Sequence, residues 1–314
     1  MANATPSRIG LVNASGTNVK ELFLKVFAGE VLTAFNETNI MQGLTMNRTI
    51  TSGKSAQFPV MWKAAADYHT AGSELIGANA IKHQEKVINI DEMLISDAFI
   101  HELDEAMNHY DVRSEYSKQL GEALALRYDK NVLQTIILAA RASSNFSSPD
   151  GFGGTTITDA GNDTSGATLA SSLFTAAQTL DEKDVPETER YCVLRPKNYY
   201  LLASTTDVIN KDWDGAGSYS KGKVMEVAGI TIFKSNNVPQ SVISGNTGEN
   251  NTYSGTFSDV VGAVFHPSCV GTVKLRDLKM EMEYDIRRQG TLMLGKYAMG
   301  HGILRPESAI EISK

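Results

Sequence analysis

Residues 217–224, with the sequence GSYSKGKV, come close to a motif that binds nucleotide phosphates. In such a loop the backbone N–H groups surround the phosphates, a lysine contacts them, and a final Ser or Thr hydroxyl binds Mg²⁺. Here Val224 stands where that hydroxyl is needed. The motif also requires a helix after the loop, whereas the sequence predicts a strand there. We therefore interpret the segment as a flexible glycine loop and not as a nucleotide site.

A second candidate is a group of acids and histidines, His101, Asp104, Glu105, His109 and Asp111. On a helix, His101 and Glu105 would lie one turn apart, which is a usable spacing for metal ligands. Acidic residues in the first turn of a helix are, however, also favoured by the helix dipole. We therefore predict a solvated start of a helix here and no metal site.

Catalytic residues are not indicated elsewhere in the chain. Asp67, His69 and several serines form neither a nucleophile elbow nor a triad with a known spacing. Cys192 and Cys269 lie far apart in the sequence, so we expect two buried thiols and not a disulfide or a metal site. We predict that the chain is not an enzyme and uses no cofactor and no metal.

Three aromatic residues, Phe58, Trp62 and Tyr68, lie near Lys54 and Lys63. Such a series could stack on the bases of a nucleic acid. Aromatic residues are equally enriched where proteins contact proteins. The net charge of −7 favours the protein interface, because proteins that hold phosphates are usually basic. A DNA-binding accessory protein that uses residues 48–68 remains the alternative.

Charge and hydrophobicity set further limits on function. The longest basic clusters are Lys221–Lys223 and Arg287–Arg288. Clusters this short argue against a protein that recognises a DNA sequence, but they are compatible with non-specific contact with DNA. No stretch approaches about 18 uninterrupted apolar residues, so we expect no membrane span. The N-terminus has no apolar core and is not expected to be a signal peptide.

The strongest structural pattern is helical and extends from about Tyr110 to about Ala142. Apolar side chains recur there at steps of three to five residues, at Val112, Tyr116, Leu120, Leu124, Leu133 and Ile137. This spacing predicts a helix of roughly 30 residues, about 45 Å long, which we interpret as a structural spine. Gly121 lies within it and is either a point where the helix bends or a site of close packing against the C-terminal strands.

Two segments, 46–61 and 81–95, alternate like strands but contain few apolar residues. They flank the turn-rich residues 63–80, and we predict that they form a two-stranded arm. A lone hairpin is at best marginally stable in water, so the arm packs either on its own domain or on a second chain. We favour the second chain. Arg48 and Lys54 share one face of the first predicted strand, where they would meet acidic residues of a neighbour.

The remaining pattern indicates an α+β protein. A Ser/Gly/Pro-rich segment at 143–154 predicts a domain boundary. We expect helices at 21–35, 166–182 and 197–204, strands at 191–196 and 259–275, a hairpin at 224–235 around Ala228-Gly229, and strands at 278–312 that pair back against the long helix.

Three blocks of sequence carry a family resemblance. They are ELFLKVFAGEVLTAF at 21–35, RTITSGKSAQFPV at 48–60, and the long helix that follows AMNHY at 106–110. They resemble, in this order, the N-terminal helix, the first strand of the extended loop and the spine helix of the major capsid (coat) proteins of T-seven-like short-tailed double-stranded-DNA phages, the podoviruses. ILRPESAI at 303–310 resembles the closing strand of the wider HK-ninety-seven-like (Johnson) capsid fold.

The resemblance implies an α+β fold of the HK-ninety-seven-like type with four parts. These are an N-terminal arm at 1–45, an extended β-hairpin loop at 46–92, a peripheral domain that joins 93–150 to 273–314, and an axial domain at 151–272. The peripheral domain would contain the long spine helix. Residues 62–80 and most of the axial domain depart from the family's pattern.

The resemblance also implies a function, which is self-assembly into the icosahedral head shell that encloses phage double-stranded DNA. The expected partners are further copies of the chain in pentamers and hexamers, a scaffolding protein during assembly, a portal protein at one vertex, and the packaged DNA through non-specific contact. No membrane is expected. The chain would be part of the virion capsid and would be assembled in the cytoplasm of the host bacterium.

The candidate functional residues follow from this expectation. We predict that contacts between subunits involve charged and aromatic residues of the arm and of the C-terminal strands, namely Arg48, Lys54, Phe58, Trp62, Arg287 and Arg288. Gly121 is predicted to be a hinge of the spine helix.

Overall fold

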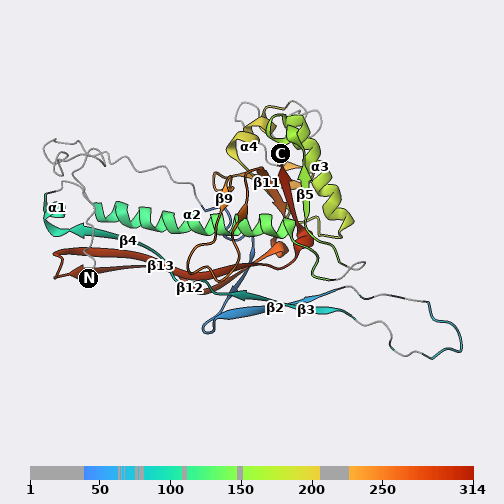
Figure 1. Cartoon of the computed structure of the whole chain (residues 1–314), viewed down its shortest axis with the longest axis horizontal. Coiled ribbons are helices and arrows are strands. Elements are labelled where there is room, and N and C mark those ends of the chain that lie inside the picture. The colour runs from blue at the N-terminus through green and yellow to red at the C-terminus, as the bar shows by residue number, and fades with distance from the viewer. Residues whose placement is uncertain are drawn as a thin grey trace. The chain divides into compact units, whose positions relative to one another are not determined.

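The computed structural model describes residues 39–62, 64, 66, 68–74, 77, 81–107, 112–146, 151–205 and 226–314 (Figure 1). The chain divides into two compact units. Most described residues of unit 1 lie in Glu92–Tyr128 and Arg276–Met299, whereas unit 2 comprises Ile40–Asp91, Asp129–Leu275 and Gly300–Lys314. The predicted helix at 21–35 and the glycine loop at 217–224 lie outside the described residues.

The longest element is helix α2, Val112–Arg141, and it confirms the predicted spine. Its 30 residues correspond to a length of about 45 Å. The apolar positions that predicted the helix are buried at Leu120, Leu124, Leu133 and Ile137. A helix of this length therefore forms because one side of it is covered by the rest of the chain.

Unit 1 combines part of α2 with antiparallel strands. Strand β4, Leu94–His101, pairs with β13, Gly290–Ile303, from Tyr297 opposite Leu94 to Gly290 opposite His101. A short helix α1, Glu102–Ala106, follows β4, and strand β12 is Val270–Asp285. Ile100, Leu120 and Met293 form a buried cluster, which confirms that a C-terminal strand packs against the spine helix.

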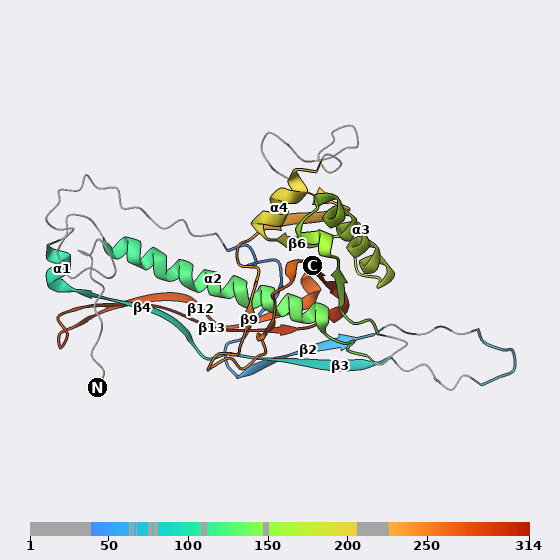
Figure 2. The same cartoon turned by 45° about the horizontal axis from the view of Figure 1, so that its top comes forward.

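Unit 2 contains a mixed six-stranded sheet in the order β5-β14-β11-β6-β8-β7. Its strands are β5 (Thr155–Thr158), β6 (Tyr191–Leu194), β7 (Glu226–Val227), β8 (Ile230–Lys234), β11 (Val260–Phe265) and β14 (Ala309–Ser313). Helices α3, Gly166–Glu182, and α4, Pro196–Ala203, pack on one face of it (Figure 2). The core between them is continuous and apolar, with Leu173, Leu202 and Val264 fully buried. These elements confirm the predicted helices and the strand near 191–196. The continuous strand predicted at 259–275 is wrong, because the 3-10 helix Pro267–Cys269 separates β11 from β12.

Local chemistry fixes the ends of these elements. The Ser165 hydroxyl accepts a hydrogen bond from the Thr168 N–H at the start of α3, as an N-cap does. Asp184, with φ 55°, ends the helix in a left-handed conformation before Val185. Ala228 and Gly229 both have positive φ, which is the requirement of a two-residue hairpin turn, and they connect β7 to β8 as predicted.

The predicted arm is present, with shorter strands than expected. Strand β2, Ser55–Met61, pairs antiparallel with β3, His83–Asn89. The continuous strand predicted at 46–61 is wrong, because the chain turns at Gly53, where φ is 107°. Its first part is a separate strand, β1 (Met46–Thr49), which pairs in parallel with Gly271–Lys274 of β12.

The smaller elements all belong to unit 2. They are strands β9 (Val242–Ile243) and β10 (Gly255–Thr256), which pair with each other, and the 3-10 helices η2 (Ala160–Asp163), η5 (Pro267–Cys269) and η6 (Pro306–Ser308). None of the helices formed by the described residues is long and apolar enough to cross a lipid bilayer.

Candidate functional site

The β2–β3 arm has two different faces. On the inner face, Ala56, Val60 and Ile88 are buried within the chain itself. On the outer face, Met61 is 60% exposed and Val87 is 52% exposed. The favoured sequence interpretation required an arm that packs only on a second chain. The structure instead shows that the inner face packs on its own unit, while the outer face is exposed and available for another contact.

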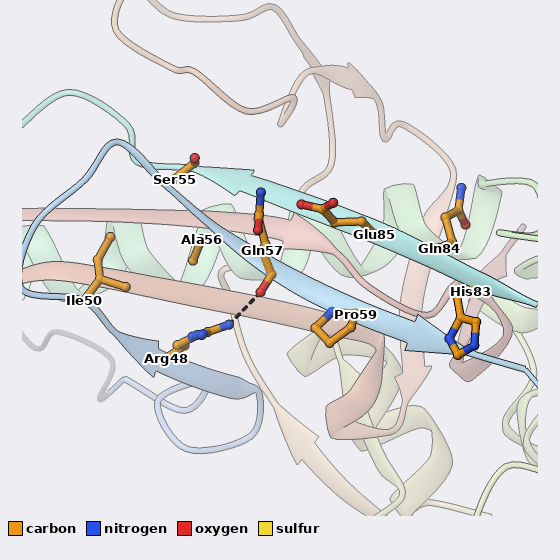
Figure 3. A pocket seen from close by; sticks show the side chains of 9 residues that line it. All are labelled: Arg48, Ile50, Ser55, Ala56, Gln57, Pro59, His83, Gln84 and Glu85. Atoms are coloured by element: carbon orange, nitrogen blue, oxygen red, sulfur yellow. Dashed lines mark hydrogen bonds between the residues drawn. The ribbon is translucent and has the colours of Figure 1, made fainter.

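Arg48 holds strand β2 of the arm close to β1. Its Nη1 donates a hydrogen bond of 2.6 Å to the Gln57 carbonyl oxygen, and its guanidinium lies 5.5 Å from the centre of the Phe58 ring. Beside this contact is an open hollow, lined also by Ile50, Pro59 and Glu85 (Figure 3). The predicted role of Arg48 and Phe58 at a subunit contact remains a prediction, whereas their contact within the chain is direct.

Lys54 does not share a strand face with Arg48, because it lies in the turn between β1 and β2. Its side chain is exposed, and its carbonyl oxygen accepts a hydrogen bond of 2.8 Å from the Ile90 N–H. The lysine therefore stands at the base of the arm with its charge in solvent. Its predicted contact with a neighbouring acid remains a prediction.

Trp62 packs within the chain at the end of β2. Its ring centre lies 5.3 Å from that of Phe146 and 6.4 Å from that of Phe152. Tyr68, in contrast, is fully exposed. Because Phe58, Trp62 and Tyr68 have three different environments, they do not form the continuous stacking surface that a nucleic-acid strand needs.

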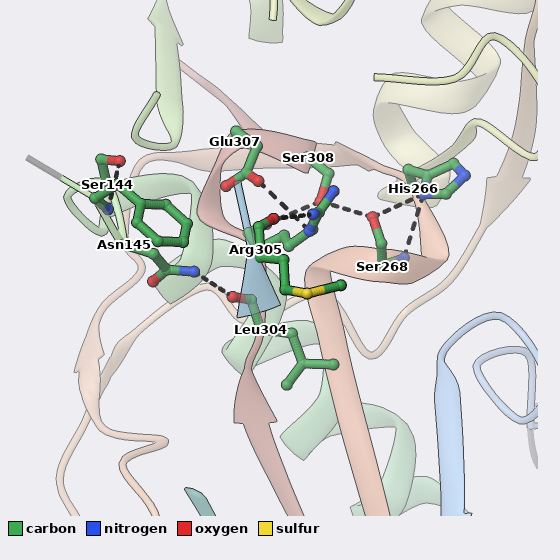
Figure 4. A network of polar contacts seen from close by, with 10 residues as sticks. Ser144, Asn145, His266, Ser268, Leu304, Arg305, Glu307 and Ser308 are labelled. Atoms are coloured by element: carbon green, nitrogen blue, oxygen red, sulfur yellow. Dashed lines mark hydrogen bonds and ion pairs between the residues drawn. The ribbon is translucent and has the colours of Figure 1, made fainter. Parts of the chain in front are cut away.

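A polar network connects the end of β2 to the segment 304–308 (Figure 4). Arg305 Nη2 donates to the Met61 carbonyl oxygen at 3.4 Å, and Arg305 Nε lies 3.7 Å from a Glu307 carboxylate oxygen. Asn145 Nδ2 donates to the Leu304 carbonyl oxygen at 2.6 Å. Burial raises the pKa of Glu307, and the nearby Arg305 opposes that rise.

The other half of this network caps the corner between β11 and β12. The Ser268 hydroxyl donates to the Ser308 hydroxyl oxygen at 3.2 Å and lies 2.8 Å from His266 Nδ1. Burial lowers the pKa of His266. The residues that resemble the closing strand of the capsid fold thus join the arm, the end of α2 and this corner.

Sequence reasoning missed Asn145, Phe146 and Phe152. They lie in the segment that we interpreted as a linker, and they hold Leu304 and Trp62 in place. The available signal was the presence of two phenylalanines and an asparagine among the serines and glycines of 143–154. Linkers that are only spacers rarely contain such residues.

The turn between β12 and β13 carries the other predicted contact residues. The Asp285 carboxylate accepts hydrogen bonds of 2.9 Å from the Arg287 N–H and from Arg288 Nη1. Both arginines are exposed, and Ile286 beside them is 73% exposed. Their predicted role between subunits is untested, but Arg288 already has a partner within the turn.

Gly121 lies in an uninterrupted part of α2. A Cβ atom built at this position meets no atom of the described residues within 4 Å, which contradicts the alternative of close packing against the described part of the C-terminal strands. The interpretation of Gly121 as a hinge remains a prediction.

Among the residues that the structure describes, the remaining sequence candidates do not assemble into a reactive site. Cys192 and Cys269 are free and buried as predicted, and burial raises the pKa of both thiols. His101 ends β4, Asp104 is buried in α1, and His109 and Asp111 lie outside the described residues. Within the described part of the chain, no three His, Cys, Asp or Glu side chains are grouped so that they could hold a metal ion.

Comparisons with known proteins give one consistent result. The family model described as "Gp10A-like: Major capsid protein" matches residues 57–313. The major capsid protein of Escherichia phage T7 is 36% identical over an alignment that covers 92% of this chain and 90% of that protein. A chain of the capsid of cyanophage P-SCSP1u is 50% identical, with a TM-score of 0.84 and 99% of each chain covered. The mature capsid of bacteriophage PhiM1, at 19% identity, shares the fold with a TM-score of 0.76 over 99% of this chain and 98% of that one.

Proposed function

The chain belongs to the Gp10A-like family of major capsid proteins, and we propose that its β2–β3 arm joins neighbouring copies into the shell. As a major capsid protein it is a structural component of a phage virion and associates with copies of itself in an icosahedral capsid. The resemblance to capsid proteins of T-seven-like phages and the HK-ninety-seven-like fold are confirmed.

The finer organisation belongs to the proposal. The copies form pentamers and hexamers around double-stranded DNA, with a scaffolding protein during assembly and a portal protein at one vertex, in the cytoplasm of the host. The four parts are the N-terminal arm 1–45, the extended loop 46–92, the peripheral domain 93–150 with 273–314, and the axial domain 151–272. Family membership supports this organisation, and no step in it requires catalysis, a cofactor or a metal.

The two-sided arm is the observation that carries the proposal. Its inner face is buried on its own unit, so the strands are positioned before any neighbour arrives. Its outer face exposes Met61 and Val87 beside the hollow at Arg48. Within the described residues the arm is a separate two-stranded sheet, which leaves strand edges open to a second chain.

The turn between β12 and β13 supplies a second proposed contact. Ile286 and Arg287 are exposed there, next to a hollow lined by Glu283, Tyr284 and Leu292. An exposed apolar residue surrounded by charged residues is typical of a small protein contact with a polar rim. Many such contacts add up in a shell, although each one is weak.

Deletion of residues 64–80 tests the role of the arm. The variant keeps Trp62 and closes β2 and β3 with an Asn-Gly turn, so that the packing of Trp62 on Phe146 is preserved. We expect a folded, soluble chain that forms no shells in electron microscopy. The control keeps the length of 64–80 but replaces its residues with Gly and Ser. It distinguishes an effect of the length of the arm tip from an effect of its side chains. Shells of normal yield and size from both variants would contradict the proposal.

A further inference from the structure

The root of the arm, residues 88–91, is seated against glycines of the C-terminal strands. A Cβ atom built on Gly300 would lie 1.9 Å from the Asn89 carbonyl oxygen, and one on Gly302 would lie 2.7 Å from Ile88 Cγ1. A Cβ on Gly271 would lie 2.9 Å from Ile88 Cδ1. Distances below about 3 Å are not tolerated without movement, so three glycines create the space that the root occupies.

The side chain of Asn251 completes this seat on the backbone of the root. Its Oδ1 accepts a hydrogen bond of 3.2 Å from the Asn89 N–H, and its Nδ2 donates one of 2.8 Å to the Asn89 carbonyl oxygen. One side chain thus bonds both backbone groups of Asn89, as a neighbouring strand would. Asn250 Nδ2 adds a bond of 2.7 Å to the Ile90 carbonyl oxygen.

Asp91 anchors the other end of the root. Its Oδ1 accepts hydrogen bonds from the N–H groups of Asn250 and Asn251, at 2.9 and 3.2 Å, and from Asn251 Nδ2 at 2.9 Å. Its Oδ2 accepts a bond of 2.6 Å from the Tyr253 hydroxyl. A carboxylate that accepts four donors is held in one orientation, because each bond excludes different rotations.

Tyr253 connects this carboxylate to the glycine seat. Its hydroxyl oxygen accepts a hydrogen bond of 2.9 Å from the backbone N–H of His301, the residue between Gly300 and Gly302. The His301 side chain is buried, and its Nδ1 lies 2.9 Å from the Thr272 hydroxyl. The contacts between residues 250–253, 300–302 and the root therefore form one continuous network.

We propose that Asn250–Tyr253 and Gly300–Gly302 form a socket that sets the direction in which the arm leaves its unit. The socket acts as a positioning device for assembly and contacts no neighbour itself. This inference rests on the proposed role of the arm between subunits. The backbone of the root forms hydrogen bonds with the side chains of Asn250 and Asn251 as well as with strand β2. Single side-chain substitutions can therefore loosen the root while the six-stranded sheet stays intact.

The test uses three variants of the full chain. Tyr253→Phe removes only the hydroxyl and with it the connection between Asp91 and His301. Asn251→Ala removes both bonds to Asn89, and Gly300→Ala forces the root away from its seat. Gly245→Ala is the matched control, because a Cβ at this glycine meets no atom of the described part of the chain within 4 Å and the residue lies in the same loop.

Hydrogen exchange of the unassembled chain gives the first measurement. We expect amides of 84–90 to exchange about tenfold faster in Tyr253→Phe and Asn251→Ala, while amides of β6 and β11 keep their rates. Shell yield should fall in parallel, and Gly245→Ala should match the wild type in both measurements. Uniformly faster exchange in β6 and β11 would show that Gly300→Ala unfolds the chain. In that case the exchange rates at 84–90 and the shell yield of Tyr253→Phe test the inference.

Two outcomes would overturn the inference. Unchanged exchange at 84–90 would mean that the socket does not hold the root. Faster exchange with normal shells would mean that the direction of the arm does not matter for assembly. Both results differ from the result that would contradict the proposed function of the arm. That result would be normal shells after deletion of residues 64–80.

Discussion

The six-stranded sheet and the β2–β3 arm, both in unit 2, are stabilised in opposite ways. The sheet buries apolar side chains between its strands and the helices α3 and α4, and nothing outside the chain is needed to complete that core. The arm has two strands, one buried face, and a root that is held by amide, carboxylate and hydroxyl groups. The sheet therefore contributes most of the free energy of folding, whereas the contacts of the arm mainly fix the orientation of its strands.

This difference separates the free energy of unfolding of the single chain from the ability of the chain to assemble into a shell. Substitutions in or against the sheet should change the free energy of unfolding of the single chain. Substitutions on the outer face of the arm should change assembly and leave that free energy nearly constant. The following variants test this separation.

Arg141→Ala should have the largest effect and should act on the sheet. Arg141 ends α2 and donates two hydrogen bonds of 2.6 Å to the carboxylate of Glu311, which is only 1% exposed in β14. Removing the guanidinium leaves a buried carboxylate without its charged partner, which costs about 2–4 kcal/mol of unfolding free energy. Urea unfolding would measure this loss. Lys118→Ala, which breaks the exposed pair with Glu122 on the same helix, is the control and should cost less than about 0.5 kcal/mol.

The pH dependence of stability should report on His301 in the socket that holds the arm root. Burial lowers the pKa of His301 to about 3, whereas the unfolded chain has a value near 6.5. The unfolded state therefore binds the proton more tightly, and the stability present above pH 6.5 is lost as the pH falls from there toward 3. Between pH 7 and 5 the loss should be about 2 kcal/mol.

His301→Gln should flatten this dependence, which unfolding curves at pH 7 and pH 5 would show. Asp91 acts in the opposite sense, because burial raises its pKa and protonation then favours the folded state. An equally steep loss of stability in the variant would assign the acid sensitivity to other groups.

Gly121→Ala should stabilise the unassembled chain by about 0.5–1 kcal/mol, because alanine favours a helix and the new methyl group meets no described atom within 4 Å. If Gly121 is a hinge, the stiffer helix should spare initial assembly but slow or block the expansion of the assembled shells. Thermal unfolding and electron microscopy together decide this point. A more stable chain with the normal ratio of compact to expanded particles would remove the hinge interpretation.

Lys54→Glu should have the smallest effect on the chain itself, within about 0.5 kcal/mol, because its side chain is exposed at the base of the arm. Its effect should appear in assembly, which we expect to weaken and to become more dependent on salt concentration. Light scattering across a salt series measures this. Identical assembly curves for wild type and variant would exclude a charge contact at this position.

Elements defined by local patterns were predictable from the sequence. The spacing of Leu120, Leu124 and Leu133 predicted α2, and Ala228-Gly229 marked the hairpin turn. The break at Gly53 was not predicted, because the alternation of side chains continues on both sides of it while the backbone turns.

The contacts at the base of the arm were beyond prediction for a different reason. Asp91 and Tyr253 are separated by 162 positions, and residues 244–255 have the composition of an ordinary surface loop. Nothing local distinguishes Gly300, whose missing Cβ matters because Asn89 lies against it, from a glycine in open space such as Gly245. Pairings of this kind become visible only when the chain is folded.

The backbone closure at the end of the arm has a consequence for how the chain can vary. The Trp62 N–H donates to the Lys82 carbonyl oxygen at 3.0 Å, so the ladder is closed before the tip begins. Lengthening the segment between these two residues adds only loop entropy, about 0.6 kcal/mol for each doubling of its length. Insertions at this point, including foreign peptides, should therefore be tolerated by the folded chain. If the arm lies against a neighbouring copy, as we propose, the space that this copy leaves limits the size of the insertions, and related shells should differ at this point.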